Sequence, residues 1–223
     1  MISFLLTEDA KNEARNLLKK MEENQSVSFP PSPEYPLSMV KDGNMFGVLI
    51  AETKGGERKV LYGYSGAIQG HYDVPGFVHS CYSAKDFQVI FDKYDARIHA
   101  LTDQIEKEGR EDLKEERRAL SNTAQKEIEK IFVFSKWNGE RMHGLPPRPR
   151  TGTGECAGLK LINTALRKGW EMKGLAEFRY HKDREPEFLP PCEERCGTLL
   201  PDMLGLKFLY ADEDIAVVEK KSG

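Results

Sequence analysis

Long apolar runs are missing from this chain of 223 residues, so the sequence predicts no membrane-spanning helix. An excess of one charge is missing as well. The 33 Lys and Arg stand against 36 Asp and Glu, a formal net charge of −3, which argues against a surface that is basic all round. The four cysteines are too few for a disulfide scaffold, and the first residues carry no secretory signal pattern. We therefore expect a cytoplasmic protein whose cysteines are free thiols or metal ligands.

What the chain does contain suggests an N-terminal helix and then a β-hairpin. Residues 1–42 are expected to hold an amphipathic helix over 7–23, capped by Thr7, and a proline-rich linker. Residues 43–83 contain two β-rich runs on either side of a Gly-Gly turn. This segment is predicted to form the hairpin part of an α/β body.

Residues 84–131 have a different pattern, with apolar side chains spaced by three and four. The first arm of this pattern consists of Phe87, Phe91, Tyr94, Ile98, Leu101 and Ile105. Such a heptad repeat favours a coiled-coil seam, and Gly109 interrupts it before a second apolar arm. We expect an antiparallel coiled-coil helical hairpin with its tip near Gly109. An arm of this kind can bind a protein partner.

Residues 132–208 are predicted to continue the α/β body. A helix is expected from Glu155 to Lys168, followed by a strand from Lys173 to Tyr180 and a short helix over 190–204. Both helices begin beside cysteines. The predicted fold class is therefore mixed α/β, a sheet-and-helix body interrupted by the helical hairpin.

The candidate chemistry of this body lies in three cysteines, Cys156, Cys192 and Cys196. A helix N-terminus favours the thiolate form of a cysteine, and thiolates are the ligands that zinc prefers. If the two helices are neighbours on one face of the sheet, the three sulfurs can converge on a zinc ion. His181 is the candidate fourth ligand because it is near in sequence. The alternative is that the cysteines simply pack in the core, as free cysteines commonly do.

The order of these segments resembles the zinc-dependent cytidine deaminase fold, whose signature is a ligand two residues before a catalytic Glu, then Pro-Cys-x-x-Cys. Here Gly158 stands two residues after Cys156, and the later pair reads Pro191-Cys192-x-x-x-Cys196. Because no Glu occupies position 158, the sequence offers no obvious proton shuttle. We therefore expect a deaminase-like scaffold without the activity.

A basic segment precedes the first cysteine and suggests contact with an RNA backbone. The candidate residues are Arg148, Arg150, Lys160 and Arg167. They surround the glycine-containing stretch 151–154, which can cradle a phosphate at a helix start. The alternative is a tight turn among solvated charges.

Several stretches resemble the N-terminal extension of RluA-type RNA pseudouridine synthases. They are Met45-Phe46-Gly47-Val48-Leu49, Thr151-Gly152-Thr153-Gly154-Glu155-Cys156-Ala157, Ala176-Glu177-Phe178 and Pro190-Pro191-Cys192-Glu193-Glu194-Arg195-Cys196. Residues 209–223 resemble the entry strand of the catalytic domain in that family, with matches at Tyr210, Asp212, Val218, Lys220 and Gly223. The family's His-Arg-Leu-Asp motif does not occur in the sequence, so no catalytic residue is carried over.

The resemblance implies an accessory module of a pseudouridine synthase, one that contacts ribosomal or transfer RNA and has no synthase activity alone. On this interpretation residues 209–223 are the start of a truncated catalytic domain. Two alternatives remain open from the sequence. One is a divergent zinc-dependent nucleoside or base deaminase, and the other is a scaffold whose coiled-coil arm binds a protein.

Overall fold

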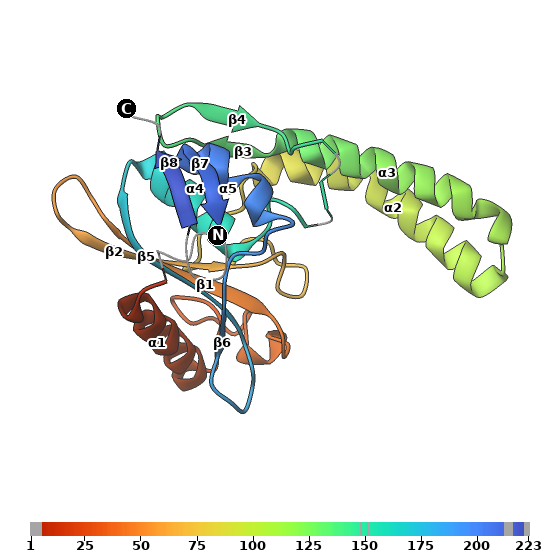
Figure 1. Cartoon of the computed structure of the whole chain (residues 1–223). Helices are drawn as coiled ribbons and strands as arrows, with labels where there is room; N and C mark the ends of the chain where they lie inside the picture. The colour runs from red at the N-terminus through yellow and green to blue at the C-terminus, as the bar shows by residue number, and fades with distance from the viewer. Residues whose placement is uncertain (1–5, 148, 151, 212–215, 221–223) are drawn as a thin grey trace. The chain divides into compact units, whose positions relative to one another are not determined.

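A four-stranded antiparallel sheet in the order β2-β1-β5-β6 organises the fold (Figure 1). Its strands are β1 (Met45–Glu52), β2 (Arg58–Tyr64), β5 (Glu171–Arg179) and β6 (Glu187–Leu189). Val48 is central in this sheet, since it pairs with Tyr62 on β2 and with Ala176 on β5. The β-hairpin expected within residues 43–83 is confirmed as β1 and β2, and the predicted mixed α/β class is correct.

The computed structural model describes residues 6–147, 149–150, 152–211 and 216–220. Two compact units divide the chain. Unit 1 comprises Met1–Cys81, Phe134–Met142 and Pro146–Gly223, and unit 2 comprises Tyr82–Val133 and His143–Leu145. The segment 84–131, expected to be a helical hairpin, thus lies in unit 2. The expected segment 1–42 lies in unit 1 with the sheet, and so does most of 132–208. Residues 132–133 and 143–145 of that last segment belong to unit 2.

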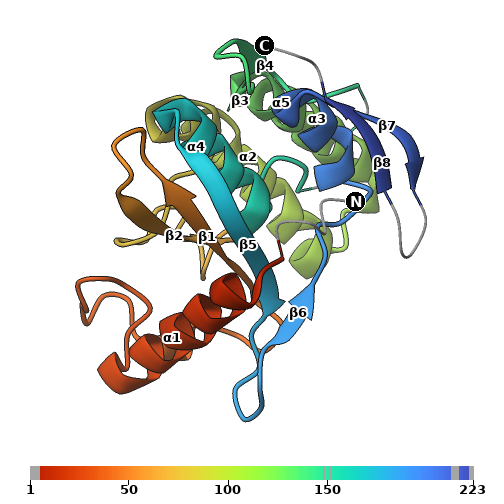
Figure 2. The ribbon, with the colours of Figure 1, turned by 60° about the vertical axis from the view of Figure 1, so that its left-hand side comes forward.

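Helix α1 (Glu8–Asn24) covers one face of the sheet (Figures 1 and 2). The side chain of Thr7 caps it by accepting a hydrogen bond of 3.2 Å from the amide of Ala10, as the sequence predicts. Its buried residues are Ala10, Ala14, Leu17, Leu18 and Met21. They pack on alternate residues of the strands, among them Phe46 and Phe178, because successive side chains of a strand point to opposite faces.

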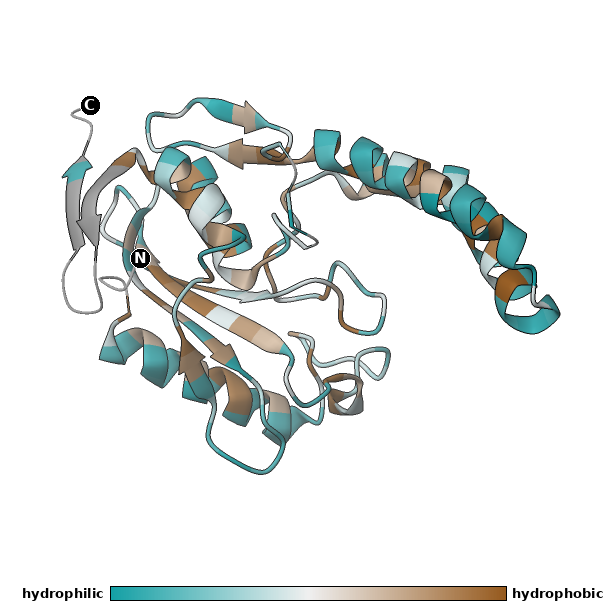
Figure 3. Ribbon diagram, turned by 45° about the vertical axis from the view of Figure 1, so that its right-hand side comes forward, coloured by the Kyte–Doolittle hydropathy of each residue, from teal (hydrophilic) through white to brown (hydrophobic). Residues whose placement is uncertain are grey.

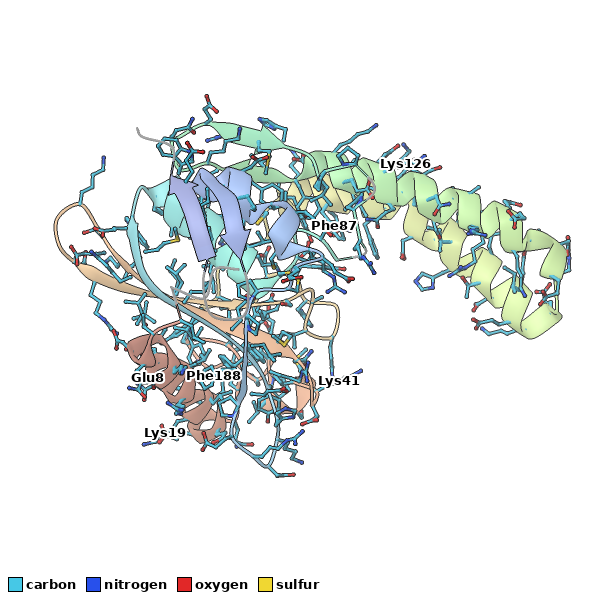
Figure 4. All side chains as sticks on the ribbon, viewed as in Figure 1. Glu8, Lys19, Lys41, Phe87, Lys126 and Phe188 are labelled. Carbon is cyan, nitrogen blue, oxygen red and sulfur yellow. The ribbon has the colours of Figure 1, made fainter. Side chains whose placement is uncertain are left out.

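The segment after α1 is not the extended linker that its prolines suggest. Ser26, Val27 and Ser28 are buried, and the Val27 amide donates to the Tyr35 carbonyl at 2.9 Å. Val27 joins the core under α1. An antiparallel bridge joins Ser26 to Pro36, so the chain folds back on itself here and packs against the sheet, and the expected extended linker is wrong. Figure 4 shows Phe188 of β6 on the same side of the sheet, beside α1, where Arg15 lies 5.4 Å from its ring.

Helix α4 (Ala157–Lys168) covers the opposite face and approaches the strands closely (Figure 1). The approach depends on Gly47 and Gly63, which are paired across β1 and β2. A Cβ atom at Gly47 would lie 2.9 Å from Leu161 Cδ1 and 3.2 Å from Ala157 Cβ. Gly169 ends the helix in the left-handed conformation, as the sequence predicts.

Unit 2 contains two helices, α2 (Ala84–Glu108) and α3 (Lys114–Ile131), that pack against one another. Gly109 ends α2 with φ of 69° at the expected tip, and η3 (Glu111–Leu113) leads into α3. Figure 3 shows narrow hydrophobic stretches between long hydrophilic ones in both helices. The coiled-coil packing and a protein partner for it stay predictions.

The apolar seam of α2 differs from the expected one at its start. Ile90 is buried, whereas Phe91 is 43% exposed. The Phe91 ring stacks on that of Phe87, with 6.1 Å between the ring centroids, and Ile90 takes the buried position in its place. Farther along, Tyr94 and Leu101 are buried as expected, and the Tyr94 hydroxyl donates to Glu127 of α3 at 2.7 Å.

The sequence predicts one short helix over 190–204, and this prediction is wrong. The structure has η4 (Cys196–Thr198) and α5 (Leu200–Leu204) instead. Gly197 and Pro201 explain the break, because glycine is a poor helix former and proline lacks the amide that a helix interior needs. Two further pairs of strands are β3 (Val133–Ser135) with β4 (Arg141–His143), and β7 (Leu206–Ala211) with β8 (Ala216–Lys220).

The C-terminal strand that resembles a synthase entry strand pairs with β7, and Leu206 lies opposite Lys220 in that antiparallel pair. Asp212 and Gly223, two of the residues that match the family pattern, lie outside the described residues. In the part of the chain that the structure covers, we find no helix with both the length and the apolar character required to cross a bilayer.

Substituting Gly47 by alanine should destabilise unit 1, because the new methyl group would overlap Leu161 and Ala157. Overpacking of this kind costs about 1–3 kcal/mol of unfolding free energy. Gly55→Ala is the matched control, since a Cβ there meets only Thr53 Oγ1, at 3.7 Å. Chemical denaturation of both variants at a fixed zinc concentration measures the difference. Equal midpoints for the two variants would show that α4 does not need the close approach.

Candidate metal centre

Cys156 is held at the start of α4, where it occupies the N-cap position. The loop after β2 fixes this helix start. Ser65 Oγ accepts a hydrogen bond of 2.9 Å from the Ala157 amide, and the Gly66 amide donates to the Glu155 carbonyl at 3.0 Å. The first turn of α4 is thereby bound to the same sheet that carries β5.

Cys192 and Cys196 belong to the irregular segment between β6 and α5. The Gly197 amide donates to the Cys192 carbonyl at 3.1 Å, which closes a turn around the three residues between the cysteines. This turn brings the two Sγ atoms to 3.7 Å from one another. Cys196 is buried and Cys192 is exposed, so the pair lies at the edge of the interior.

The structure brings together the three cysteines that the sequence singles out. The Sγ atoms of Cys156, Cys192 and Cys196 all lie within 4.8 Å of one another. Two thiolates bound to a tetrahedral zinc at about 2.3 Å are separated by about 3.8 Å, close to the separation of the Cys192 and Cys196 sulfurs. The cluster can therefore hold a metal ion.

The thiols of this cluster influence each other strongly. A hydrogen bond from Cys196, with help from Cys192 and the nearby Arg195, holds the pKa of Cys156 below its usual value. The same interaction with Cys156, together with burial, raises the pKa of Cys196. Three sulfurs this close cannot all carry a negative charge without a cation. The arrangement therefore favours the thiolate at Cys156 over the thiolate at Cys196.

Glu177 is a buried carboxylate beside this cluster that sequence reasoning missed as a site residue. It projects from β5 toward α4, and its Oε1 accepts a hydrogen bond of 2.8 Å from the Gly158 amide. Burial raises the pKa of Glu177, and the Gly158 amide opposes that shift. Glu177 also interacts electrostatically with Cys156 and Cys196. The signal in the sequence was a charged residue within an apolar strand, between Ala176 and Phe178.

His181 does not join the three cysteines, although the sequence suggested it as a fourth ligand. Its Nδ1 lies 3.2 Å from Asp42 and 3.0 Å from Arg184, and its Nε2 lies 3.6 Å from Glu187. These contacts place the ring in a polar network at the end of β5. Proximity in sequence was misleading because the strand carries His181 away from the helix start where Cys156 lies.

The fourth cysteine, Cys81, is buried apart from the cluster. Burial raises its pKa to about 12, partly offset by the neighbouring Lys160 and by a hydrogen bond with Asn163. At neutral pH Cys81 is therefore a protonated thiol, and it is not one of the cysteines whose sulfurs converge.

The candidate RNA-binding residues have different environments. Lys160 is 1% exposed, and its ammonium lies 3.1 Å from Glu155 and 4.9 Å from the Tyr64 ring centre. The expectation of an RNA contact there is corrected, because α4 turns this side chain into the protein. Arg150 and Arg167 are exposed, and Arg150 pairs with Glu194 at 2.9 Å. Arg148 lies outside the described residues.

Reactivity should separate the cluster from Cys81. In metal-free protein at pH 8, iodoacetamide should label Cys192 first because it is exposed, then Cys156 because its lowered pKa increases the thiolate fraction. Cys81 should react only after unfolding. Peptide mass spectrometry follows each site, with protein in denaturant as the control that labels all four. Labelling of folded Cys81 as fast as Cys192 would contradict the burial described here.

Comparisons of the chain with protein-family models, with characterised proteins and with solved structures gave no match.

Proposed function

We propose that this chain is a zinc-binding accessory module of an RNA-modifying enzyme of the RluA pseudouridine synthase type, without synthase activity of its own. The observation that carries the metal part is the convergence of Cys156, Cys192 and Cys196 within 4.8 Å. Zinc is the metal that suits such a set best, since thiolates are soft ligands and tetrahedral sulfur sites are typical of zinc.

The ion would stabilise a part of unit 1 that has little regular structure. The segment between β6 and α5 contains only the three-residue η4, whereas Cys156 stands on a helix bound to the sheet. A metal that joins both would fix this segment against α4. In this role zinc replaces the hydrophobic core that so irregular a segment does not build for itself.

The RNA part of the proposal is supported by sequence resemblance and by the placement of two basic residues. The cysteine-bearing stretches are the most specific part of the likeness to the synthase extensions. Arg150 lies just before the stretch that leads to Cys156, and Arg167 lies in the last turn of α4, both exposed. Exposed guanidinium groups suit contacts with RNA phosphates.

A deaminase-like body is the finer fold that we propose for unit 1. In its favour is the order of elements: the antiparallel pair β1 and β2, then α4 opening at Cys156, then β5, then the pair Cys192 and Cys196. This order is the one in which the zinc deaminases present their ligands.

Purified protein should contain about one zinc per chain, and replacing any one of the three clustered cysteines should remove it. Because changes in the outer shell of a metal site already weaken binding about 10–100-fold, loss of a direct ligand in Cys156→Ser should weaken it at least as much. Cys81→Ala is the control that keeps the metal. Elemental analysis and competition with a chromogenic chelator give the stoichiometry and affinity. Full zinc content in the single serine variants of Cys156, Cys192 and Cys196 would refute the site.

Zinc-loaded protein should bind single-stranded RNA with a strong dependence on salt. The double variant Arg150→Ala and Arg167→Ala should bind more weakly, and its salt slope should fall by about 0.7 for each RNA phosphate that an arginine no longer neutralises. Lys19→Ala with Lys41→Ala is the matched control, because it removes the same charge from exposed positions that Figure 4 labels away from α4. Fluorescence anisotropy at several salt concentrations measures both. Equal affinities for the two double variants would contradict an RNA contact at these arginines.

A further inference from the structure

The carboxylate of Glu177 fills the space that a side chain at position 158 would need. A Cβ atom added to Gly158 would lie 2.8 Å from Glu177 Cδ and 2.8 Å from its Oε2. Gly158 is two residues after Cys156, on the first turn of α4. The strand thus places a carboxylate beside the first turn of α4, at the point where a side chain of residue 158 would begin.

The two oxygens of this carboxylate have different surroundings. Oε1 accepts a hydrogen bond of 2.8 Å from the Gly158 amide, which fixes the orientation of the group. Oε2 makes no hydrogen bond with the described residues. Glu177 is 6% exposed, and a buried carboxylate without a cation is costly, so packing alone gives no reason for glutamate at this position.

The cysteine cluster supplies three ligands, and a tetrahedral zinc takes four. His181 and Cys81 are engaged elsewhere, and within the described part of the chain the group of close ligand atoms contains the three sulfurs alone. Structural zinc sites are closed by four protein ligands, whereas catalytic sites keep one position for water or substrate. Cys192 is exposed, so solvent reaches the cluster from its side.

We propose that the three cysteines and Glu177 form a hydrolytic deaminase centre that acts on an amino-substituted nucleobase, of the cytosine or adenine type, in a nucleoside or in RNA. The inference rests on the proposed zinc site and adds a reaction to it. Glu177 serves as the general acid and base, in place of the glutamate that the helix lacks at position 158. The lack of a glutamate at position 158 argued against deaminase activity. On this proposal Glu177 of β5 takes the role of that glutamate.

The reaction needs only water as co-reactant. Zinc at the cluster would make the water more acidic and orient it. Glu177 Oε2 takes a proton from the water as its oxygen bonds to the ring carbon that bears the amine, and the proton passes to the adjacent ring nitrogen. Glu177 then moves the remaining hydroxyl proton to the amine, the carbon–nitrogen bond breaks, and ammonia leaves. A carbonyl replaces the amine, so atoms and electrons balance without an oxidant or reductant.

The competing explanation is that Glu177 only caps the first turn of α4. Glu177→Gln distinguishes the two roles, because its amide oxygen can still accept from the Gly158 amide but cannot shuttle protons. If Glu177 only caps the helix, the Glu177→Gln variant keeps its activity. If Glu177 is the general base, this variant loses its activity.

The experiment uses the full chain loaded with zinc and three probes: cytidine, adenosine, and a single-stranded RNA oligonucleotide that contains both bases. Ammonia release and a product mass increase of about one dalton, expected when an amine becomes a carbonyl, report the reaction. Glu177→Gln should keep its zinc and lose activity by about 100-fold or more. Cys81→Ala should keep both. The exchange variant Glu177→Gly with Gly158→Glu should recover part of the activity.

Each outcome has a distinct meaning. Protein that binds no zinc would refute the metal site and with it this inference. One bound zinc with no ammonia from any probe would overturn the deaminase centre and leave the zinc-binding module standing. Activity that is the same in Glu177→Gln and wild type would assign the proton shuttle to another group and overturn the role of Glu177.

Discussion

The close approach of α4 to the sheet is the constraint on which the rest of the site depends. The helix start can lie against the strands only because Gly47 and Gly63 leave room for Ala157 and Leu161. Gly158 then leaves room for the carboxylate of β5. The three glycines therefore act together: two set the distance of the helix from the sheet, and the third admits a charged group between them. A methyl group at any of these positions would move Cys156 relative to its partners.

This close packing gathers acidic groups in one poorly solvated place. Cys156, Cys196 and Glu177 are all buried. Glu177 raises the pKa of both thiols, and the hydrogen bond between the thiols lowers the pKa of Cys156 while it raises that of Cys196. Arg195 and the Gly158 amide offset the cost of ionisation in part. A divalent cation would offset it far more effectively, because thiolates that repel one another in its absence become its ligands. Buried ionisable groups of this kind lower the stability of the folded protein, which is why we interpret the cluster as functional.

Local patterns in the sequence predicted much of the fold, and they failed where long-range packing decides. Thr7 and Gly169 mark helix ends through their own chemistry, so α1 and α4 were predictable. The segment around Val27 was not, because its proline content does not reveal that the chain folds back between Ser26 and Pro36 and becomes buried. Lys160 shows the same limit, since its position on α4 turns a basic residue inward toward Glu155. The cysteines were identified by residue type, whereas Glu177 required the knowledge that β5 passes beside the first turn of α4.

X-ray absorption at the zinc edge of the zinc-loaded protein tests the central claim most directly, because it counts the atoms bound to the metal. We expect three sulfur atoms at about 2.3 Å from the zinc and one lighter oxygen or nitrogen atom at about 2.0 Å. Such a shell would place the metal among Cys156, Cys192 and Cys196 with one position open. Four sulfur atoms would mean that Cys81 or a second chain closes the site. A shell of oxygen and nitrogen alone would place the metal somewhere else and contradict the account.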